Sequence, residues 1–360
     1  MEPGIEELLF YCRAGFEKDL AGELAAEAGR AGLAVYLRFA DAAAFVRLLP
    51  ADGQPEALRE ALALEDRIFA RQRLPALHPL EGLPREDRVG PIVERVQAAG
   101  WSFETIWHET PDTNEGKQLQ RLGKALERPL AAALRAAGSL RESGAAGGRR
   151  LHCFWTAGDR VQPGLAEPDR SSDRPGGILR LKAPRAAPSR SALKLEEAWH
   201  QFLTPAEREQ RLSEGMSAVD LGAAPGGWTW QLVRRGLHVQ AVDNGPMDPG
   251  LMAGGQVEHV REDAFTWLPP RPVHWLVCDI VDRPGRVSDR IGDWLEAGWA
   301  EEAIFNLKLP MKKRYETVRE CLDRLEGRLA GRGFRLRARQ LYHDREEITV
   351  HARPPRGRPA

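Results

Sequence analysis

The sequence has little cysteine, no paired cysteines and no excess of charge of either sign. Four cysteines (Cys12, Cys153, Cys278 and Cys321) occur among 360 residues, without a CxxC pair and without a His/Cys cluster at zinc spacing. We therefore expect reduced thiols, a cytoplasmic location and no metal site. Lys plus Arg and Asp plus Glu each number 52, so the formal net charge is zero. This balance gives no support to nucleic-acid binding by the whole surface, but it permits local basic patches.

Long apolar runs are absent as well. No window approaches the roughly 18 apolar residues of a membrane span, and the acidic stretch MEPGIEELLFYCRAGFEKDL lacks the basic start of a signal peptide. We therefore expect no membrane association. Hydrophobic residues make up 42% and charged residues 29% of the chain, which is typical of a globular protein with substantial cores.

The chain is long enough for two domains, and its patterns divide it. Residues 1–160 mix strand-like runs such as ELLFYC and LHCFWTAG with helical patterns, which predicts an α+β region. Residues 161–190 are rich in Pro, Gly, Ser and Arg and predict a linker. In residues 191–353 strands and helices alternate, which predicts a mostly parallel sheet with helices on both faces and a final hairpin. Residues 354–360 form a basic tail.

A glycine-rich loop, DLGAAPGG, runs from Asp220 to Gly227 between a predicted strand and a predicted helix. Glycine lets the backbone approach a ligand closely. The loop lacks the GK-Ser/Thr ending of a phosphate loop and the GxGxxG spacing of a dinucleotide site. An adenosine ligand without phosphate, such as S-adenosylmethionine, fits better. Asp243, about 20 residues after Gly222, suits the ribose hydroxyls, and Asp263 suits the adenine. The alternative is a set of ordinary turns at strand ends.

Two lysines and two carboxylates also fall at the ends of predicted elements. Lys308 ends the apolar strand of FNLKLP, and Asp279 ends a neighbouring strand, so the two are expected to pair across the top of the sheet. Lys194 lies in the first turn of a predicted helix. Glu347, or its neighbour Glu346, lies on the last hairpin. This set suits proton handling, because burial and a nearby cation lower the pKa of a lysine. Two structural ion pairs are the alternative.

These segments resemble a known family. The strings PSRSALKLEEAWHQFL, DLGAAPGGWTWQLVRRG, VDNGPM, REDAF, VCDIVDRP, IFNLKLPMKKRYE and QLYHDREEITVHARP resemble the RlmM family of bacterial 23S rRNA (cytidine-2′-O)-methyltransferases. In the N-terminal part, CRAGFEKDLAGE, DRIFARQ, LPREDRVGPIV and DTNEGKQL resemble its THUMP-containing RNA-binding region. The resemblance therefore extends over nearly the whole chain.

The resemblance implies a Rossmann-like class I methyltransferase domain, with a mostly parallel seven-stranded sheet and a C-terminal antiparallel hairpin. It implies S-adenosylmethionine as cofactor and 23S rRNA as partner, free or in an early large-subunit assembly intermediate, with no obligate protein partner. It also implies a catalytic tetrad of Lys194, Asp279, Lys308 and Glu347, in which Asp279 orients Lys308 as the proton acceptor. The implied cofactor-binding positions are Ser191, Ala224, Pro225, Gly226, Gly227, Asp243, Asp263 and Asp279.

RNA binding by a neutral chain needs local basic patches. Lys312, Lys313 and Arg314 follow the Lys308 strand directly, and Lys117 lies in DTNEGK. We expect these four residues to contact RNA phosphates, with simple solvation as the alternative.

Two other functions compete with 2′-O methylation. A base methyltransferase would carry an Asn-Pro-Pro-Tyr-like string at a strand end, whereas this chain has CDIVDRP. A noncatalytic RNA-binding assembly factor would have lost the tetrad or the glycine loop, and both are present.

Overall fold

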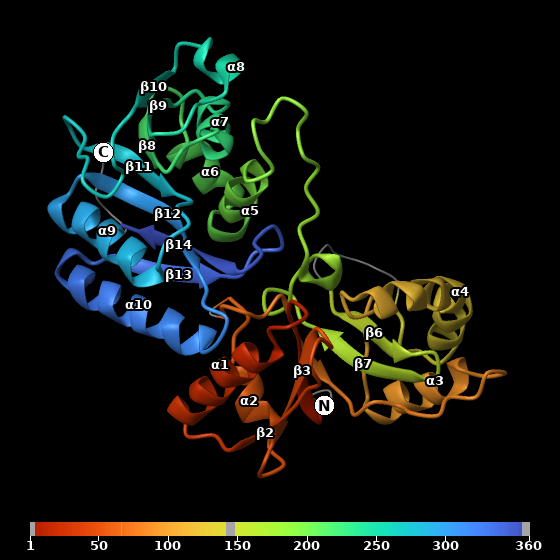
Figure 1. Cartoon of the computed structure of the whole chain (residues 1–360). Coiled ribbons are helices and arrows are strands. Elements are labelled where there is room, and N and C mark those ends of the chain that lie inside the picture. The colour runs from red at the N-terminus through yellow and green to blue at the C-terminus, as the bar shows by residue number, and fades with distance from the viewer. Residues whose placement is uncertain (1–3, 66, 142–147, 355–360) are drawn as a thin grey trace. The chain divides into compact units, whose positions relative to one another are not determined.

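The computed structural model describes residues 4–65, 67–141 and 148–354 (Figure 1). The chain divides into two compact units, Met1–Ile178 and Leu179–Ala360. All four cysteines are buried free thiols. No helix in the described ranges is both long and apolar enough to cross a bilayer. Most of the predicted basic tail (355–360) lies outside the described residues.

The first unit contains a seven-stranded sheet in the order β2-β3-β1-β4-β7-β6-β5. Neighbouring strands are antiparallel except β5 and β6, which are parallel. Helices α1 and α2 pack on strands β1 to β3, and α4 packs on β5, β6 and α3. The elements are β1 (Glu7–Tyr11), α1 (Glu17–Arg30), β2 (Val35–Arg38), β3 (Phe45–Pro50), α2 (Pro55–Ala61), β4 (Gln72–Ala76), α3 (Val89–Ala98), β5 (Thr105–Glu109), α4 (Asn114–Ala136), β6 (Arg150–Ala157), β7 (Arg160–Ala166) and the 3₁₀ turn η1 (Pro175–Gly177).

Strand β7 lies where the sequence predicts a linker. It pairs with β6 over most of its length and with β4 through Gly164, so the predicted linker start at residue 161 is wrong. The segment VQPGLA looks like a turn because it contains Pro163 and Gly164. Both residues suit the strand, because the Pro163 carbonyl accepts from Leu77 N at 3.0 Å and a Cβ at position 164 would lie 3.0 Å from the Leu74 side chain. The unit boundary falls after Ile178 instead.

The second unit is an α/β unit with another seven-stranded sheet, in the order β10-β9-β8-β11-β12-β14-β13. The five neighbouring strands β10, β9, β8, β11 and β12 are parallel, and β14 is antiparallel to both of its neighbours, β12 and β13. Helices α5 and α7 pack together, as do α9 and α10 (Figure 1). The elements are α5 (Ala192–Phe202), α6 (Pro205–Arg211), β8 (Ser217–Leu221), α7 (Gly227–Val233), β9 (His238–Val242), α8 (Pro249–Met252), β10 (Val257–Val260), β11 (Val273–Cys278), α9 (Pro284–Ala297), β12 (Ala300–Lys308), α10 (Arg314–Leu329), η2 (Ala330–Arg332), β13 (Arg335–Arg339) and β14 (Glu347–Arg353).

The central strands of this sheet are buried apolar runs. β11 reads VHWLVC and β12 reads AEEAIFNLK. Only one residue of these two strands, Glu301 in β12, is exposed. Such continuous runs are typical of parallel strands covered on both faces. Polar side chains at the carboxyl ends of β8, β9, β11 and β12 are thereby gathered at one edge of the sheet.

Candidate active site

Four charged side chains from distant parts of the chain meet at this edge. Lys194 lies in the first turn of α5, and Asp279 directly follows β11. Lys308 is the last residue of β12, and Glu347 is the first residue of β14. The antiparallel register of these two strands places Lys308 opposite Glu347. The structure therefore brings together all four residues of the expected tetrad.

The ion pairs among these residues form a chain. Lys194 Nζ lies 3.1 and 3.2 Å from the two carboxylate oxygens of Asp279 and 2.8 Å from Glu347 Oε1. Lys308 Nζ lies 3.0 Å from Glu347 Oε2. The predicted pairing of Asp279 with Lys308 is wrong, because the ion pair of Asp279 is with Lys194. The register explains this, since Cys278 lies opposite Phe305 and β12 runs further, past Asn306.

The choice between the two glutamates of the hairpin follows from the alternation of β14. The Glu347 side chain is 6% exposed and points into the cluster. The Glu346 side chain is 52% exposed and pairs with Arg314 at 2.9 Å. Of the two, Glu347 is the one that belongs to the cluster.

Burial and charge act against each other on these groups. Burial lowers the pKa of Lys194, but the carboxylates of Asp279 and Glu347 outweigh it, so that pKa is raised above its usual value. Burial raises the pKa of Asp279, and Lys194 and Asn306 offset this only in part. Burial also acts on Glu347, but hydrogen bonds from both lysines hold its pKa below the usual value. The cluster is therefore built around an ionised Glu347.

A buried hydrogen-bond chain supports Asp279 from behind. Asn306 Nδ2 donates to Asp279 Oδ1 at 2.7 Å, and Asn306 Oδ1 accepts from the Thr349 hydroxyl at 2.8 Å. The same hydroxyl lies 3.1 Å from Asp344, which is fully buried. Burial raises the pKa of Asp344 well above its usual value. The Thr349 hydroxyl therefore links the amide of Asn306 to a buried carboxyl.

Helix α5 also holds the loop that precedes Glu347. Glu197 is 2% exposed and accepts from the backbone N–H groups of Tyr342 and His343, each at 2.9 Å. It also lies 2.6 Å from His343 Nδ1. Because Lys194 and Glu197 are three residues apart, one helix face contacts both the cluster and the loop.

Sequence reasoning missed these supporting residues. Asn306 gave a usable signal, because it is a polar residue within the apolar run IFNLKL, two positions before Lys308. Glu197 gave a weaker signal through its helical spacing from Lys194. Asp344 and Thr349 gave none, because a buried carboxyl in a turn looks like any solvated loop residue.

The glycines of the loop are required by close packing within the protein. A Cβ at Gly226 would lie 2.5 Å from Leu251 Cδ2, and one at Gly227 would lie 2.3 Å from the hydroxyl oxygens of Ser189 and Ser191. Both glycines are buried, while Ala224 is half-buried and Pro225 is exposed. The accessible part of the loop is therefore its Ala-Pro turn.

Some of the expected cofactor residues contact this loop, and others lie apart from it. Asp243 accepts from Ala224 N at 3.0 Å and from Gly245 N at 2.7 Å, and it is half-buried. Ser191 lies at the start of α5, where its hydroxyl is 2.6 Å from that of Ser189 and makes no helix cap. Asp263 is exposed beyond β10 and accepts from Phe265 N at 2.9 Å. Asp243 and Ser191 thus contact the loop region, whereas Asp263 interacts within its own turn.

The expected RNA contacts fall in both units. Lys312 and Lys313 are exposed between β12 and α10, and Arg314 begins α10 and pairs with Glu346. Lys117 is exposed on α4 of the first unit.

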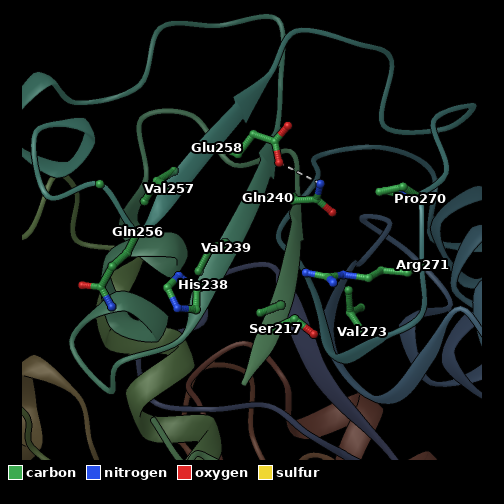
Figure 2. Close-up of a pocket in the computed structure, with 12 residues that line it drawn as sticks. Ser217, His238, Val239, Gln240, Gln256, Val257, Glu258, Pro270, Arg271 and Val273 are labelled. Atoms are coloured by element: carbon green, nitrogen blue, oxygen red, sulfur yellow. Dashed lines mark hydrogen bonds between the residues drawn. The ribbon is translucent and has the colours of Figure 1, made fainter. Parts of the chain in front are cut away.

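A cavity of about 580 Å³ lies elsewhere on the second unit (Figure 2). It is lined by the first residues of β8 to β11, among them Ser217, His238 and Val273. Figure 2 also shows the Gln240–Glu258 hydrogen bond at its wall, at 2.9 Å. These are the amino ends of the parallel strands, opposite the edge that carries the cluster. None of the expected cofactor residues lines this cavity.

Comparisons with known proteins cover both units. Three family models match: the "RlmM ferredoxin-like domain" over residues 5–74, "Ribosomal RNA large subunit methyltransferase M, N-terminal" over 87–167, and "FtsJ-like methyltransferase" over 187–297. The ribosomal RNA large subunit methyltransferase M of Chromohalobacter salexigens is 57% identical over 350 residues, covering 96% of this chain and 97% of that protein. The protein of the same name from Methylococcus capsulatus is 48% identical over 345 residues, covering 95% and 96%.

These matches agree with the Rossmann-like α/β fold of the second unit, and they describe the beginning of the first unit as ferredoxin-like. Identity at this level over nearly the full length of both proteins leaves one conclusion: the chain belongs to the ribosomal RNA large subunit methyltransferase M family.

Proposed function

We propose that the protein transfers a methyl group from S-adenosylmethionine to the 2′-hydroxyl of a cytidine in 23S rRNA. The observation that carries this proposal is the Lys194–Asp279 and Lys308–Glu347 cluster at the carboxyl edge of a sheet that also bears the glycine loop. Matched lysines and carboxylates suit proton transfer from a hydroxyl, which base methylation does not require. The names of the relatives support ribosomal RNA as the substrate class.

The residues around the loop fit the cofactor. Asp243 is half-buried, and its carboxylate retains acceptor capacity beyond its two backbone contacts, as ribose hydroxyls require. Ala224 and Pro225 present the accessible turn of the loop, and Asp263 is exposed two strand ends away. Together with Ser191, Gly226 and Gly227 they would hold S-adenosylmethionine. When bound, this cofactor supplies an electrophilic methyl group on a sulfonium sulfur.

The four charged residues have distinct roles in this proposal. Lys308 is the most accessible of them, with its side chain 39% exposed, and its amine receives the proton of the 2′-hydroxyl. Glu347 holds Lys308 in place through their 3.0 Å ion pair, and the proton that Lys308 must first release passes to solvent, which reaches its exposed side chain. Lys194 holds Asp279 and Glu347 and places positive charge near the developing oxyanion. Fixing the hydroxyl in line with the methyl group contributes further, because positioning is worth up to roughly 7–11 kcal/mol.

The first unit serves RNA binding in this proposal, with a THUMP module within residues 1–160. The substrate is free 23S rRNA or an early large-subunit assembly intermediate, and the protein acts in the cytoplasm without an obligate protein partner. Lys312, Lys313 and Arg314 contact RNA phosphates beside the site.

Methyl transfer from radiolabelled S-adenosylmethionine to unmodified 23S rRNA tests this function. We expect the wild-type protein to label a ribose, and Lys308→Ala to lose the labelling while still binding the cofactor. Nuclease digestion of the product locates the label. Label on a base would overturn the 2′-O assignment. Equal labelling by the variant would overturn the role of Lys308.

A further inference from the structure

We propose that the outer face of helix α4 (Asn114–Ala136) is a docking surface for the phosphate backbone of RNA. The proposal rests on the proposed function for its partner and goes beyond it in naming the surface. Five cations form what we call the α4 stripe: Lys117, Arg121, Lys124, Arg128 and Arg135. All five are exposed.

Their spacing places them on a single line. The intervals are four, three, four and seven residues, and at 3.6 residues per turn each interval returns to nearly the same direction. At about 1.5 Å per residue, the stripe extends for roughly 27 Å along the helix. The opposite face is apolar and packs against β5, β6 and α3 through Leu119, Leu122, Leu126, Leu130 and Leu134. The stripe therefore points directly away from the sheet.

Several exposed cations of the first unit, among them Lys18, Arg30 and Arg160, pair with an acidic side chain, whereas the stripe has no such partner within the described residues. None of its five members forms an ion pair with any residue in the described ranges, and Lys117 bonds only the Asn114 side chain there, at 3.4 Å. Glu127 follows Lys124 by three residues on the same helix, but no ion pair joins these two described side chains, and Glu127 interacts electrostatically with His108 of β5. Lys117, Arg121 and Lys124 are instead one another's neighbours at three- and four-residue spacing. Like charges at these spacings destabilise a helix, so an anionic partner would relieve a real repulsion.

The chemistry of the stripe favours RNA over a membrane or an apolar partner. A helix that binds a bilayer surface must expose its apolar face, and the apolar face of α4 is buried against the sheet. The first four cations recur every 4.5–6 Å or so along the axis, and Arg135 follows about 10.5 Å further on, which suits a polyanion with repeated charges. Contacts of this kind position an RNA without reading its sequence.

The test compares two triple variants of the full chain that remove equal charge. The stripe variant is Arg121→Gln, Lys124→Gln and Arg128→Gln, and glutamine keeps a helix propensity close to that of lysine and arginine. The control variant is Lys18→Gln, Arg30→Gln and Arg160→Gln, which removes exposed cations of the same unit that pair with Asp41, Glu27 and Glu81. Circular dichroism and thermal melting establish that both variants are folded.

Binding to unmodified 23S rRNA is then measured between about 50 and 200 mM salt. We expect the stripe variant to reduce the slope of log K against log salt by about 2–3, and to weaken binding at least tenfold at the lower salt. Its KM for RNA should rise, while kcat at saturating RNA and cofactor affinity stay at the wild-type values. The control variant should keep the wild-type slope.

The proposal would be overturned if the two variants had the same slope of log K against log salt, or if both lost the same amount of RNA affinity. The binding slope does not depend on catalysis, so the two proposals fail separately. A wild-type protein that binds RNA through the stripe but labels a base, or labels nothing, would contradict the proposed function alone. A variant that labels ribose with an unchanged KM would contradict the stripe alone.

Discussion

Glu347 contacts both lysines of the candidate site, at 2.8 and 3.0 Å. Glu347→Gln removes the negative charge between two partly buried cations, so we expect kcat for methyl transfer to fall about 100-fold or more. The melting temperature should fall as well, because Lys308 loses its carboxylate partner and Lys194 keeps only Asp279. The matched control is Glu346→Gln, whose side chain is exposed and pairs only at the surface. Comparable losses of kcat in both variants would contradict the assignment of Glu347.

Asp220 provides a pH-dependent prediction. It is buried beneath the glycine loop, where desolvation outweighs the hydrogen bond from Thr229 and raises its pKa to about 7. The folded state then holds a proton that the unfolded state has released above the usual value of 3.8. Its contribution to stability is complete below pH 4 or so, and it is lost as the pH rises through about 7.

Asp220→Asn should remove this dependence. As the pH rises from about 4 to about 7, we expect the free energy of unfolding of the wild type to fall relative to that of the variant. The fall should be at most about 1.4 kcal/mol per pH unit. Denaturant unfolding of both proteins in identical buffers measures the difference, since all other titrating groups are shared. Parallel curves would show that Asp220 is ionised in the folded protein across the range.

The individual residues of the cluster could be predicted from sequence, but their pairing could not. Strand ends and one helix start indicated Lys194, Asp279 and Lys308, and the two-residue period of the hairpin favoured Glu347 but left Glu346 open. The partner of Asp279 depends on how far β12 extends past β11, and no local pattern encodes that offset. Similarly, Asp344 takes its importance from burial by segments that are distant in sequence.

At the scale of elements, the loop before α7 depends on a glycine for its approach to α5. In Gly227→Ala the new Cβ would lie 2.3 Å from two serine hydroxyl oxygens. We expect a loss of about 1–3 kcal/mol in unfolding free energy and weaker binding of S-adenosylmethionine. Thermal melting and calorimetric titration measure both effects. The control is Gly327→Ala within α10, where nothing lies within 4 Å and alanine should be neutral or stabilising.

Strands β12 and β14 are joined behind the site through Asn306 and Thr349. Asn306→Ala removes the 2.7 Å bond to Asp279, and we expect kcat to fall roughly 10- to 100-fold, as for one hydrogen bond to a charged group. Since this bond lowers the pKa of Asp279, the acidic limb of the profile of kcat against pH should move to higher pH. A lower kcat with an unchanged profile would indicate general loosening of the sheet instead.

Most elements of both units were predictable from periodicity, and β7 shows where that reasoning fails. Proline and glycine mark turns when a strand is considered alone. In the folded sheet, β4 and β6 flank β7, and its glycine accommodates a leucine of β4. Tertiary contacts therefore outweigh local preference at this strand.

The molecule as a whole consists of two units with separate cores. The clusters around Trp155 and around Trp275 lie entirely within residues 1–178 and 179–360, respectively. We expect calorimetry to resolve two unfolding transitions. S-adenosylmethionine should stabilise only the second unit, by about 2.7 kcal/mol of unfolding free energy at 100 times its Kd. Leu151→Ala should lower the melting temperature of only the first unit. A single transition that responds to both changes would contradict independent unfolding.

Lys194 and Glu347 touch, yet about 150 residues separate them along the chain. At roughly 5–20 residues per second, a ribosome needs on the order of 10–30 seconds to proceed from one codon to the other. During that interval the nascent protein can form the glycine loop and can pair Lys194 with Asp279, but it lacks the carboxylate that anchors Lys308. The Lys308–Glu347 ion pair therefore forms only after residue 347 has been synthesised.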